Sequence, residues 1–154
     1  MEQTAVRVEG LVVNYGSFVA VDNLSFAVKS GEIYGLLGPN GAGKTSTIKV
    51  LVGVLEPRMG KVEVYDKPLS DEVAAKSLIG YVPEEVALLD SLTPREFLEF
   101  TSSIRRLETD AANARLERLV SAFELRQYFD IPIAALSMGN KQKVAVIAAL
   151  LHEP

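Results

Sequence analysis

The chain has 154 residues, 48% of them apolar and 23% charged, which suffices for one globular domain with a hydrophobic core. Its formal net charge of −4 argues against a general nucleic-acid-binding surface, so we expect no nucleic-acid partner. The lack of cysteine excludes a disulfide framework and a thiolate metal site. We find neither a signal-peptide pattern nor an apolar run of roughly 18 residues that could span a bilayer. A membrane would therefore enter the function through a partner.

Three segments alternate apolar and polar side chains and are predicted to form strands, namely 5–13, 19–28 and 61–65. The first two are separated by a turn at Asn14 to Ser17, and the dipeptide Asp22-Asn23 predicts an irregularity within the second. Three short alternating strands around one buried run indicate a mixed β layer beside a parallel core.

Two compact apolar runs have a different character. Ile33–Leu37 and Leu78–Val82 lack alternation and are bounded by turn-forming residues. Runs of this kind are typical of strands buried on both faces of a parallel sheet. The sequence therefore predicts a parallel core in addition to the mixed β layer.

A glycine-rich loop follows the first apolar run and has the pattern G-x-x-x-x-G-K-[ST]. It consists of Gly38, Pro39, Asn40, Gly41, Ala42, Gly43, Lys44 and Thr45. Its glycines allow positive φ and remove Cβ atoms, so backbone amides can turn toward a phosphate. Lys44 is expected between the β- and γ-phosphates, Thr45 on Mg²⁺, and a helix dipole behind them. The alternative is a glycine-rich turn without a ligand.

The remainder of the chain is predicted to be helical, beginning with a short helix at 71–77. In the stretch 86–135, Thr93 opens a capping box with proline at the first helical position, and a second helix follows. The last helix is expected at about 138–151, with Ser137 as its N-cap.

Together these motifs resemble the nucleotide-binding domain of ABC transporters, over essentially the whole chain. The loop at 38–45 resembles the Walker A motif. The segment Leu136-Ser137-Met138-Gly139-Asn140-Lys141-Gln142-Lys143 resembles the L-S-G-G-Q signature and the basic helix after it. The resemblance implies an α/β P-loop NTPase fold of ABC type, with a parallel core sheet, an N-terminal antiparallel β layer and a helical insertion. The expected parts are 1–85, 86–135 and 136–154.

The resemblance also implies how ATP is bound. Tyr15 lies 23 residues before Gly38, in the place of the aromatic residue that stacks on adenine in the family. Val21 is expected to pack near the base or ribose, and Ser46 extends the loop's nucleotide contacts. An aromatic residue on the surface beside a turn is the alternative for Tyr15.

The signature residues are expected to act on a different ATP molecule. In the family, the turn matched by Ser137, Met138, Gly139 and Asn140 closes on the γ-phosphate held by a second subunit, in a head-to-tail dimer. Met138 and Asn140 stand where glycine and glutamine are usual. The alternative for Ser137 is an ordinary N-cap.

Pro83-Glu84 matches the family's Q-loop, with Glu84 in place of the usual glutamine. The resemblance implies that Glu84 offers an oxygen to Mg²⁺ or to the attacking water. Lys44 and Glu84 are thus the predicted catalytic residues, and Thr45 and Glu84 the predicted metal ligands. A solvated loop glutamate is the alternative. The apolar residues Val86, Leu88 and Leu89 are expected to be exposed for docking of a membrane partner.

In the family, a helix such as 139–151 leads into the Walker B aspartate and the catalytic glutamate. The sequence ends at Pro154, so we expect a truncated or split polypeptide with a core sheet that is incomplete at its C-terminus. Loss of a base and a metal ligand costs several orders of magnitude in rate if each contributes about 10²-fold or more. We therefore expect ATP binding without efficient hydrolysis, and association through an uncovered strand edge.

The resemblance implies an ATP-binding subunit of a membrane transporter, more similar to exporters than to importers. ATP and Mg²⁺ are the expected cofactors. The expected partners are a transmembrane permease subunit and a second copy of the chain, at the cytoplasmic face of the membrane. Two alternatives remain open: a soluble ABC-type ATPase that acts on ribosomes or DNA, and a non-catalytic nucleotide-binding fragment.

Overall fold

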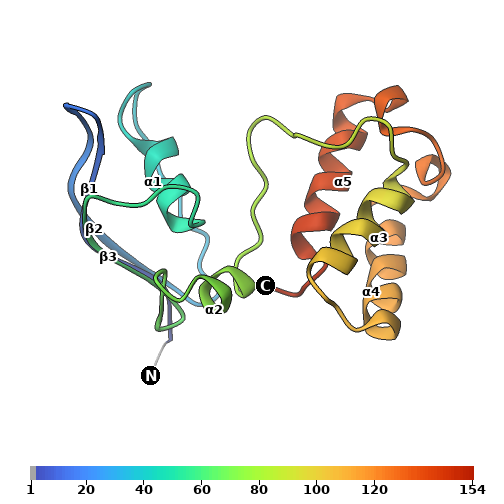
Figure 1. Cartoon of the computed structure of the whole chain (residues 1–154), viewed down its shortest axis with the longest axis horizontal. Coiled ribbons are helices and arrows are strands. Elements are labelled where there is room, and N and C mark those ends of the chain that lie inside the picture. Colours follow the sequence, from blue (N-terminus) through green and yellow to red (C-terminus); the bar gives the residue numbers. More distant parts are fainter. Residues whose placement is uncertain (1–2) are drawn as a thin grey trace. The chain divides into compact units, whose positions relative to one another are not determined.

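The computed structural model describes residues 3–154, which form two compact units (Figure 1). The N-terminal unit ends at Ile79 and contains the sheet and two helices. The C-terminal unit begins at Gly80 and is helical. The predicted helical stretch and the predicted signature helix therefore share one folding unit.

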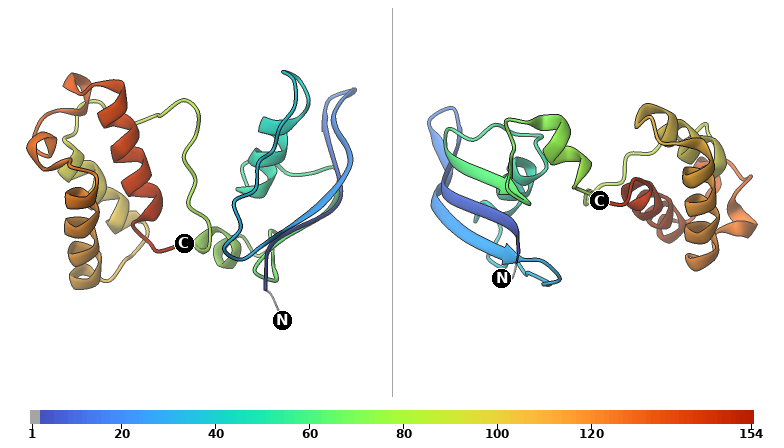
Figure 2. Two further views of the ribbon diagram at one scale, coloured as in Figure 1. Left: turned by 180° about the vertical axis from the view of Figure 1, so that it is seen from behind. Right: turned by 90° about the horizontal axis from the view of Figure 1, so that it is seen from below.

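The sheet of the N-terminal unit confirms the antiparallel β layer that the resemblance implies; the alternating segments by themselves indicate a mixed layer. Within the described residues it has four strands in the order β2-β1-β3-β4, and every neighbouring pair is antiparallel (Figure 2). The strands are β1 (Thr4–Tyr15), β2 (Phe18–Lys29), β3 (Met59–Val64) and β4 (Lys67–Pro68). The irregularity predicted at Asp22-Asn23 is present, because Asn23 has a φ of 49° and the β1–β2 register shifts around it.

Helix α1 (Lys44–Leu51) packs on this sheet through Val50, which is fully buried together with valine and leucine side chains of β1, β2 and β3. The buried set is Val8, Leu11, Val13, Val21, Val50 and Val62. Helix α2 (Glu72–Ser77) is the short helix predicted at 71–77, and the Asp71 carboxylate caps it by accepting a hydrogen bond from the amide of Ala74.

The two predicted parallel strands are not formed among the described residues, so this part of the prediction was wrong. Ile33–Leu37 and Leu78–Val82 carry no strand pairing among residues 3–154. Ile33 is fully exposed and Leu37 is 92% exposed. A parallel strand requires hydrogen bonds from a neighbouring strand, and no described segment supplies them. Tyr34 is held differently, by stacking on Phe26 of β2 with 5.2 Å between ring centroids.

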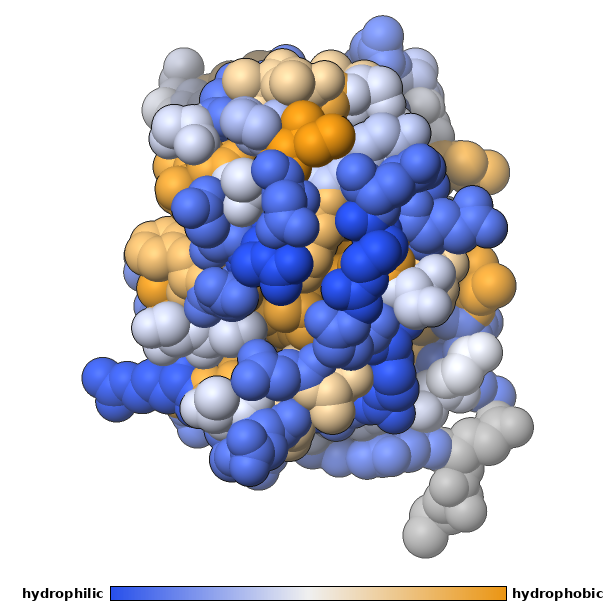
Figure 3. Space-filling model, turned by 90° about the vertical axis from the view of Figure 1, so that its right-hand side faces the viewer, coloured by the Kyte–Doolittle hydropathy of each residue, from blue (hydrophilic) through white to orange (hydrophobic). Residues whose placement is uncertain are grey.

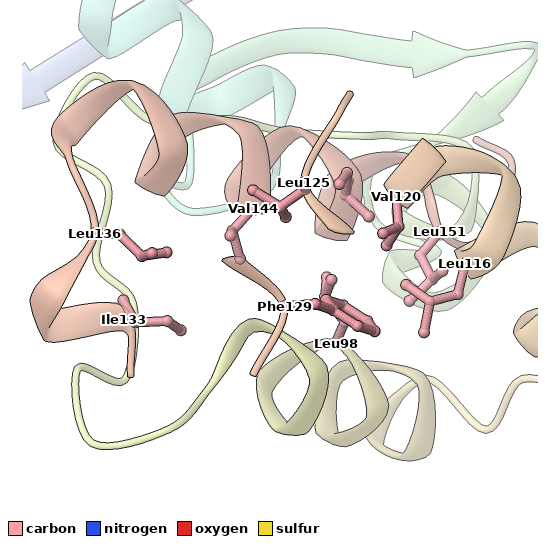
Figure 4. Packing of buried hydrophobic residues seen from close by; sticks show 10 residues of the cluster. Leu98, Leu116, Val120, Leu125, Phe129, Ile133, Leu136, Val144 and Leu151 are labelled. Atoms are coloured by element: carbon pink, nitrogen blue, oxygen red, sulfur yellow. The ribbon is translucent and has the colours of Figure 1, made fainter. Parts of the chain in front are cut away.

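The C-terminal unit consists of α3 (Pro94–Ile104), α4 (Thr109–Ala122) and α5 (Met138–Leu150), with 3-10 turns at Arg126–Tyr128 and Ile133–Ala135. Helix α3 begins as predicted: the Thr93 hydroxyl accepts from the Glu96 amide, and the Glu96 carboxylate accepts from the Thr93 amide. Apolar side chains of all three helices and of both turns converge on Phe129, which is fully buried (Figure 4).

A charged cluster surrounds the Phe129 ring. The Arg95 guanidinium lies 4.5 Å from the ring centroid and donates to both carboxylate oxygens of Asp130, at 2.8 and 3.2 Å. Arg126 lies 5.7 Å from the same ring and forms an ion pair with Glu117. The hydrogen bonds from Arg95 and Arg126 lower the pKa values of Asp130 and Glu117 below their usual range.

These lowered pKa values predict a loss of stability in acid. Because the folded-state pKa of Asp130 lies below its unfolded value, its contribution is present at neutral pH and is lost as pH falls through the folded value. The unfolding free energy of the chain should therefore fall less between pH 7 and pH 3 in Asp130→Asn than in the wild type. Urea unfolding at both pH values measures this. Glu85→Gln, an exposed loop carboxylate of the same unit, should behave as the wild type; equal acid losses in all three proteins would contradict the prediction.

No helix in residues 3–154 has the length and apolar character needed to cross a membrane. The face of the molecule drawn in Figure 3 is covered mainly by hydrophilic side chains, with apolar ones scattered among them. Such scattered apolar side chains are normal for a protein surface in water.

Candidate functional site

The phosphate-binding pattern forms an exposed turn that opens directly into α1. Gly41 and Gly43 have φ values of 84° and 82°, which side-chain-bearing residues rarely adopt, and the Ala42 amide closes the turn on the Pro39 carbonyl at 3.2 Å. Gly43 is the N-cap of α1, and no side chain of residues 3–154 caps that helix. The first amides of a helix have no acceptor within it. They are therefore available to an anion at the positive end of the helix dipole.

Position 43 requires glycine for two reasons: its backbone has a positive φ, and β2 leaves no room for a Cβ atom. A Cβ built on Gly43 would lie 2.3 Å from the Ala20 carbonyl oxygen and 2.8 Å from Cγ2 of Val21. Gly41, by contrast, has no heavy atom within 4 Å of a built Cβ. The β1–β2 hairpin is thus in contact with the C-terminal half of the loop, and Val21, which is 7% exposed, lies beneath it in the core. Its predicted contact with the base or ribose stays a prediction.

Lys44 is held within the loop rather than extended into solvent. Its ammonium donates to the carbonyls of Gly38 and Pro39, at 2.7 and 2.8 Å. These two bonds place a positive charge across the mouth of the turn. Thr45, the predicted magnesium ligand, is the next residue and is exposed.

Thr47 also supports the loop, although the sequence analysis did not single it out. It is a buried polar residue, 1% exposed, and both its amide and its hydroxyl donate to the Gly43 carbonyl, at 2.8 and 2.9 Å. A threonine four residues after the last loop glycine is the signal that was available. The contact anchors the N-cap of α1 and hence the loop amides.

Tyr15 ends β1 on the same side of the unit as the loop. Its ring is 47% exposed, and its hydroxyl lies 3.3 Å from the Ser46 hydroxyl in the first turn of α1. Tyr15 and Ser46, which were predicted independently to bind nucleotide, are thus in contact. An exposed ring tethered beside a phosphate loop suits stacking on a base.

Replacing Tyr15 distinguishes ring stacking from the hydroxyl contact. We expect Tyr15→Ala to weaken ATP binding roughly 5- to 150-fold, because stacking on an aromatic side chain is worth about 1–3 kcal/mol per base. Tyr15→Phe keeps the ring and should change affinity less than about threefold, since an exposed hydrogen bond contributes about 0.5 kcal/mol. Fluorescence titration with a labelled ATP analogue measures both. Unchanged affinity in Tyr15→Ala would show that the base binds elsewhere.

The signature segment forms the N-terminus of α5 in the C-terminal unit. The Ser137 hydroxyl accepts from the Asn140 amide at 3.3 Å, which confirms Ser137 as the N-cap. Met138 is 68% exposed, and a Cβ on Gly139 would meet no heavy atom within 4 Å. The turn therefore presents the Met138 side chain and the open position at Gly139 to solvent. The predicted roles of these four residues toward a second ATP molecule stay predictions.

Glu84 is exposed in a bend of the C-terminal unit, whereas the phosphate loop belongs to the N-terminal unit. Its predicted role toward magnesium or water stays a prediction. The expectation for the apolar residues after it was only partly right. Leu89 is 47% exposed, but Val86 and Leu88 are half-buried, and Leu88 packs on the helical core.

A hollow of about 520 Å³ lies elsewhere in the N-terminal unit, at the C-terminal end of α1. It is lined by apolar side chains such as Val50, Leu55 and Leu69, with Glu56 and Lys61 among its polar residues. No residue of the phosphate loop contributes to it. The loop is instead exposed, as expected of a site that binds phosphates through backbone amides and does not enclose the whole ligand.

The donor set of the loop fits a magnesium-bound nucleoside triphosphate. Uncapped helix amides and the Lys44 ammonium would hold phosphate oxygens. The exposed Thr45 hydroxyl is an oxygen ligand of the kind that Mg²⁺ accepts. In the described residues, histidine and carboxylate side chains do not gather into a separate metal-binding cluster.

Comparison with known proteins identifies the family. Residues 21–154 match the family model described as ABC transporter. A relative from Escherichia coli K12, the probable multidrug ABC transporter ATP-binding protein YbhF, is 37% identical over 153 residues, which is 99% of this chain and 26% of that protein.

Two solved structures are also similar. An ATP-binding subunit of an ABC transporter matches with a TM-score of 0.89 and 33% identity, over 98% of this chain and 63% of that one. CbiO1 from Clostridium perfringens, part of the transporter complex cbiONQ, matches with a TM-score of 0.85 and 27% identity, over 99% of this chain and 63% of that one. The chain thus spans about a quarter of the E. coli relative and less than two thirds of either solved chain. The chain therefore belongs to the ABC transporter family and is of the ATP-binding subunit type.

Proposed function

We propose that the chain binds ATP with Mg²⁺ through the loop at 38–45, as the nucleotide-binding part of a membrane transporter. The observation that carries the proposal is the loop geometry, in which Lys44 spans the mouth of a turn whose helix amides lack a side-chain cap. The E. coli relative is named for multidrug transport, which supports export as the direction.

The residues of the loop have separate tasks in this proposal. The amides of residues 43–45 bind the phosphate oxygens, and Lys44 exchanges its two carbonyl partners for the β- and γ-phosphates. Tyr15 orients the nucleotide by stacking on the base. A bound Mg²⁺ would neutralise phosphate charge, with Thr45 as its ligand.

Lys44→Ala provides the test. We expect the wild-type chain to bind Mg-ATP and the variant to bind it about 10- to 150-fold more weakly, because a hydrogen bond to a charged group is worth about 1.5–3 kcal/mol. Isothermal titration calorimetry measures both. Equal affinities would contradict the proposal. Lys49→Ala removes the same charge from the last turn of α1 and should bind as the wild type.

We further propose that residues 1–154 bind ATP but do not turn it over efficiently. This rests on the resemblance to the family, in which the water-activating glutamate comes from the segment after a helix like α5. Phosphate release by the chain should equal that of Lys44→Ala, since the loop residues bind and orient phosphates but supply no base. Turnover clearly above that variant would contradict this part of the proposal.

The proposed partners are a membrane permease and a second copy of the chain, at the cytoplasmic face of the membrane. Support for the permease comes from CbiO1, which is part of a transporter complex. Support for the second copy comes from the signature turn, whose Met138 and Gly139 are exposed and open. Sedimentation with and without Mg-ATP tests the second copy, and a monomer under both conditions would argue against it.

A further inference from the structure

The loop that follows Glu84 is fastened to the segment that precedes α5. The Ala134 amide donates to the Asp90 carbonyl at 3.0 Å, and the Ile133 amide donates to the Leu92 carbonyl at 2.8 Å. Both bonds lie within the C-terminal unit, and they bring residues about 40 positions apart in the chain side by side. The loop is therefore tethered at its far end.

A side-chain contact extends this tether into the signature turn. The Lys141 ammonium lies 2.9 Å from a carboxylate oxygen of Asp90, and Lys141 is only 20% exposed, while Asp90 is 65% exposed. Lys141 belongs to the first turn of α5, and its amide donates to the Ser137 carbonyl at 2.9 Å. The ion pair thus joins the loop to the turn that carries Ser137.

The ion pair also balances the charge at the N-terminal end of α5. A cation in the first turn of a helix opposes the helix dipole, and α5 has no acidic residue in that turn among the described residues. Asp90 supplies from the loop the negative charge that the helix itself lacks. Removal of Asp90 should therefore leave Lys141 unfavourably placed at a positive helix end.

We propose that Asp90 and Lys141 are positioning residues for the signature turn, holding the Ser137–Asn140 amides in register with the loop that follows Glu84. That this positioning matters for nucleotide binding rests on the proposed function. The positioning itself does not rest on it, because the order of the turn and the loop can be measured without nucleotide.

Hydrogen exchange of the nucleotide-free chain, followed by mass spectrometry, tests the proposal. Lys141→Met and Asp90→Asn should each raise exchange about two- to fivefold in peptides covering 85–92 and 137–142, the range expected from an ion pair of this exposure. The interior of α4 should not change. The double variant should exchange no faster than the single variants, because one interaction is lost in all three. Lys143→Met removes a charge from the same helix and should match the wild type.

Two further measurements separate positioning by charge from general stability. The exchanged pair Asp90→Lys with Lys141→Asp should return local exchange to within about twofold of the wild type, since opposite charges again face each other. Salt at 1 M should raise exchange in the wild type to the level of the single variants, because the Debye length falls to about 3 Å. Unchanged exchange in the single variants, or an equal rise across the whole unit, would overturn the proposal. Neither outcome would bear on ATP binding by Lys44.

Discussion

Gly43→Ala is expected to abolish measurable ATP binding while the C-terminal unit stays folded. The substitution places a Cβ 2.3 Å from the Ala20 carbonyl oxygen, and the backbone at Gly43 has a φ of 82°. A left-handed conformation alone costs an ordinary residue about 1–2 kcal/mol. The contact with backbone forces either the loop or β2 to move. Because the loop amides act only when correctly oriented, we expect at least a 100-fold loss of affinity by calorimetry, about 2.7 kcal/mol.

Gly41→Ala is the matched control for this effect. Gly41 has a similar φ of 84°, but a Cβ there would meet no heavy atom within 4 Å. The Gly41→Ala variant should therefore lose only the binding free energy that corresponds to the strained backbone conformation. This is roughly 1–2 kcal/mol, or about 5- to 30-fold in affinity. Equal losses in the two variants would show that contact with β2 does not hold the loop. Unchanged binding in Gly43→Ala would show that the loop does not depend on this geometry.

Phe129→Ala is expected to destabilise the C-terminal unit by about 3–5 kcal/mol, the range for removing a fully buried aromatic side chain. Phe129 is completely buried among apolar side chains of the three helices (Figure 4). Its ring also faces the Arg95 and Arg126 guanidinium groups, so two cation–π contacts are lost with it. Since whole domains are stable by only about 5–15 kcal/mol, the loss approaches the total.

Urea unfolding followed by far-ultraviolet circular dichroism measures this loss, because the C-terminal unit is mainly helical. Phe100→Ala makes the same chemical change in the same unit, at a side chain that is 48% exposed. It should change stability by no more than about 0.5 kcal/mol. A Phe129→Ala protein as stable as Phe100→Ala would contradict the packing described for this unit.

Local rules were sufficient for most elements. The capping box at Thr93 and the N-cap at Ser137 depend on residues three positions apart, and both were predicted from the sequence and confirmed. The alternating strands were equally readable, because a half-buried strand carries its own period. Even the irregular position at Asn23 followed from its residue type.

The two apolar runs show where local rules fail. The composition of Ile33–Leu37 predicts a buried strand, yet Ile33 and Leu37 are exposed and unpaired among the described residues. Composition states what environment a segment favours. Formation of a strand depends on a partner distant in sequence, which composition does not reveal.

The features of the candidate site also differ in whether the sequence could predict them. The phosphate loop was readable because its glycines and lysine are adjacent in sequence. Contacts that join distant residues were not, such as the Tyr15 hydroxyl beside Ser46 and the Asp90 carboxylate beside Lys141. The support that Thr47 gives the loop, by donating to the Gly43 carbonyl, became evident only in the structure, because its spacing from the loop glycines does not by itself show that its side chain turns back to them.

Nuclear magnetic resonance of the ¹⁵N-labelled chain during a titration with Mg-ATP tests ATP binding by the loop most directly, because it observes the amides themselves. We expect the amides of residues 41–46 to shift saturably and by more than any others, with Tyr15 among the next largest shifts. The same titration of Lys44→Ala should leave these amides in place at equal ATP concentrations. Saturable shifts centred on other residues, such as those lining the hollow around Leu55 and Leu69, would contradict ATP binding by this loop.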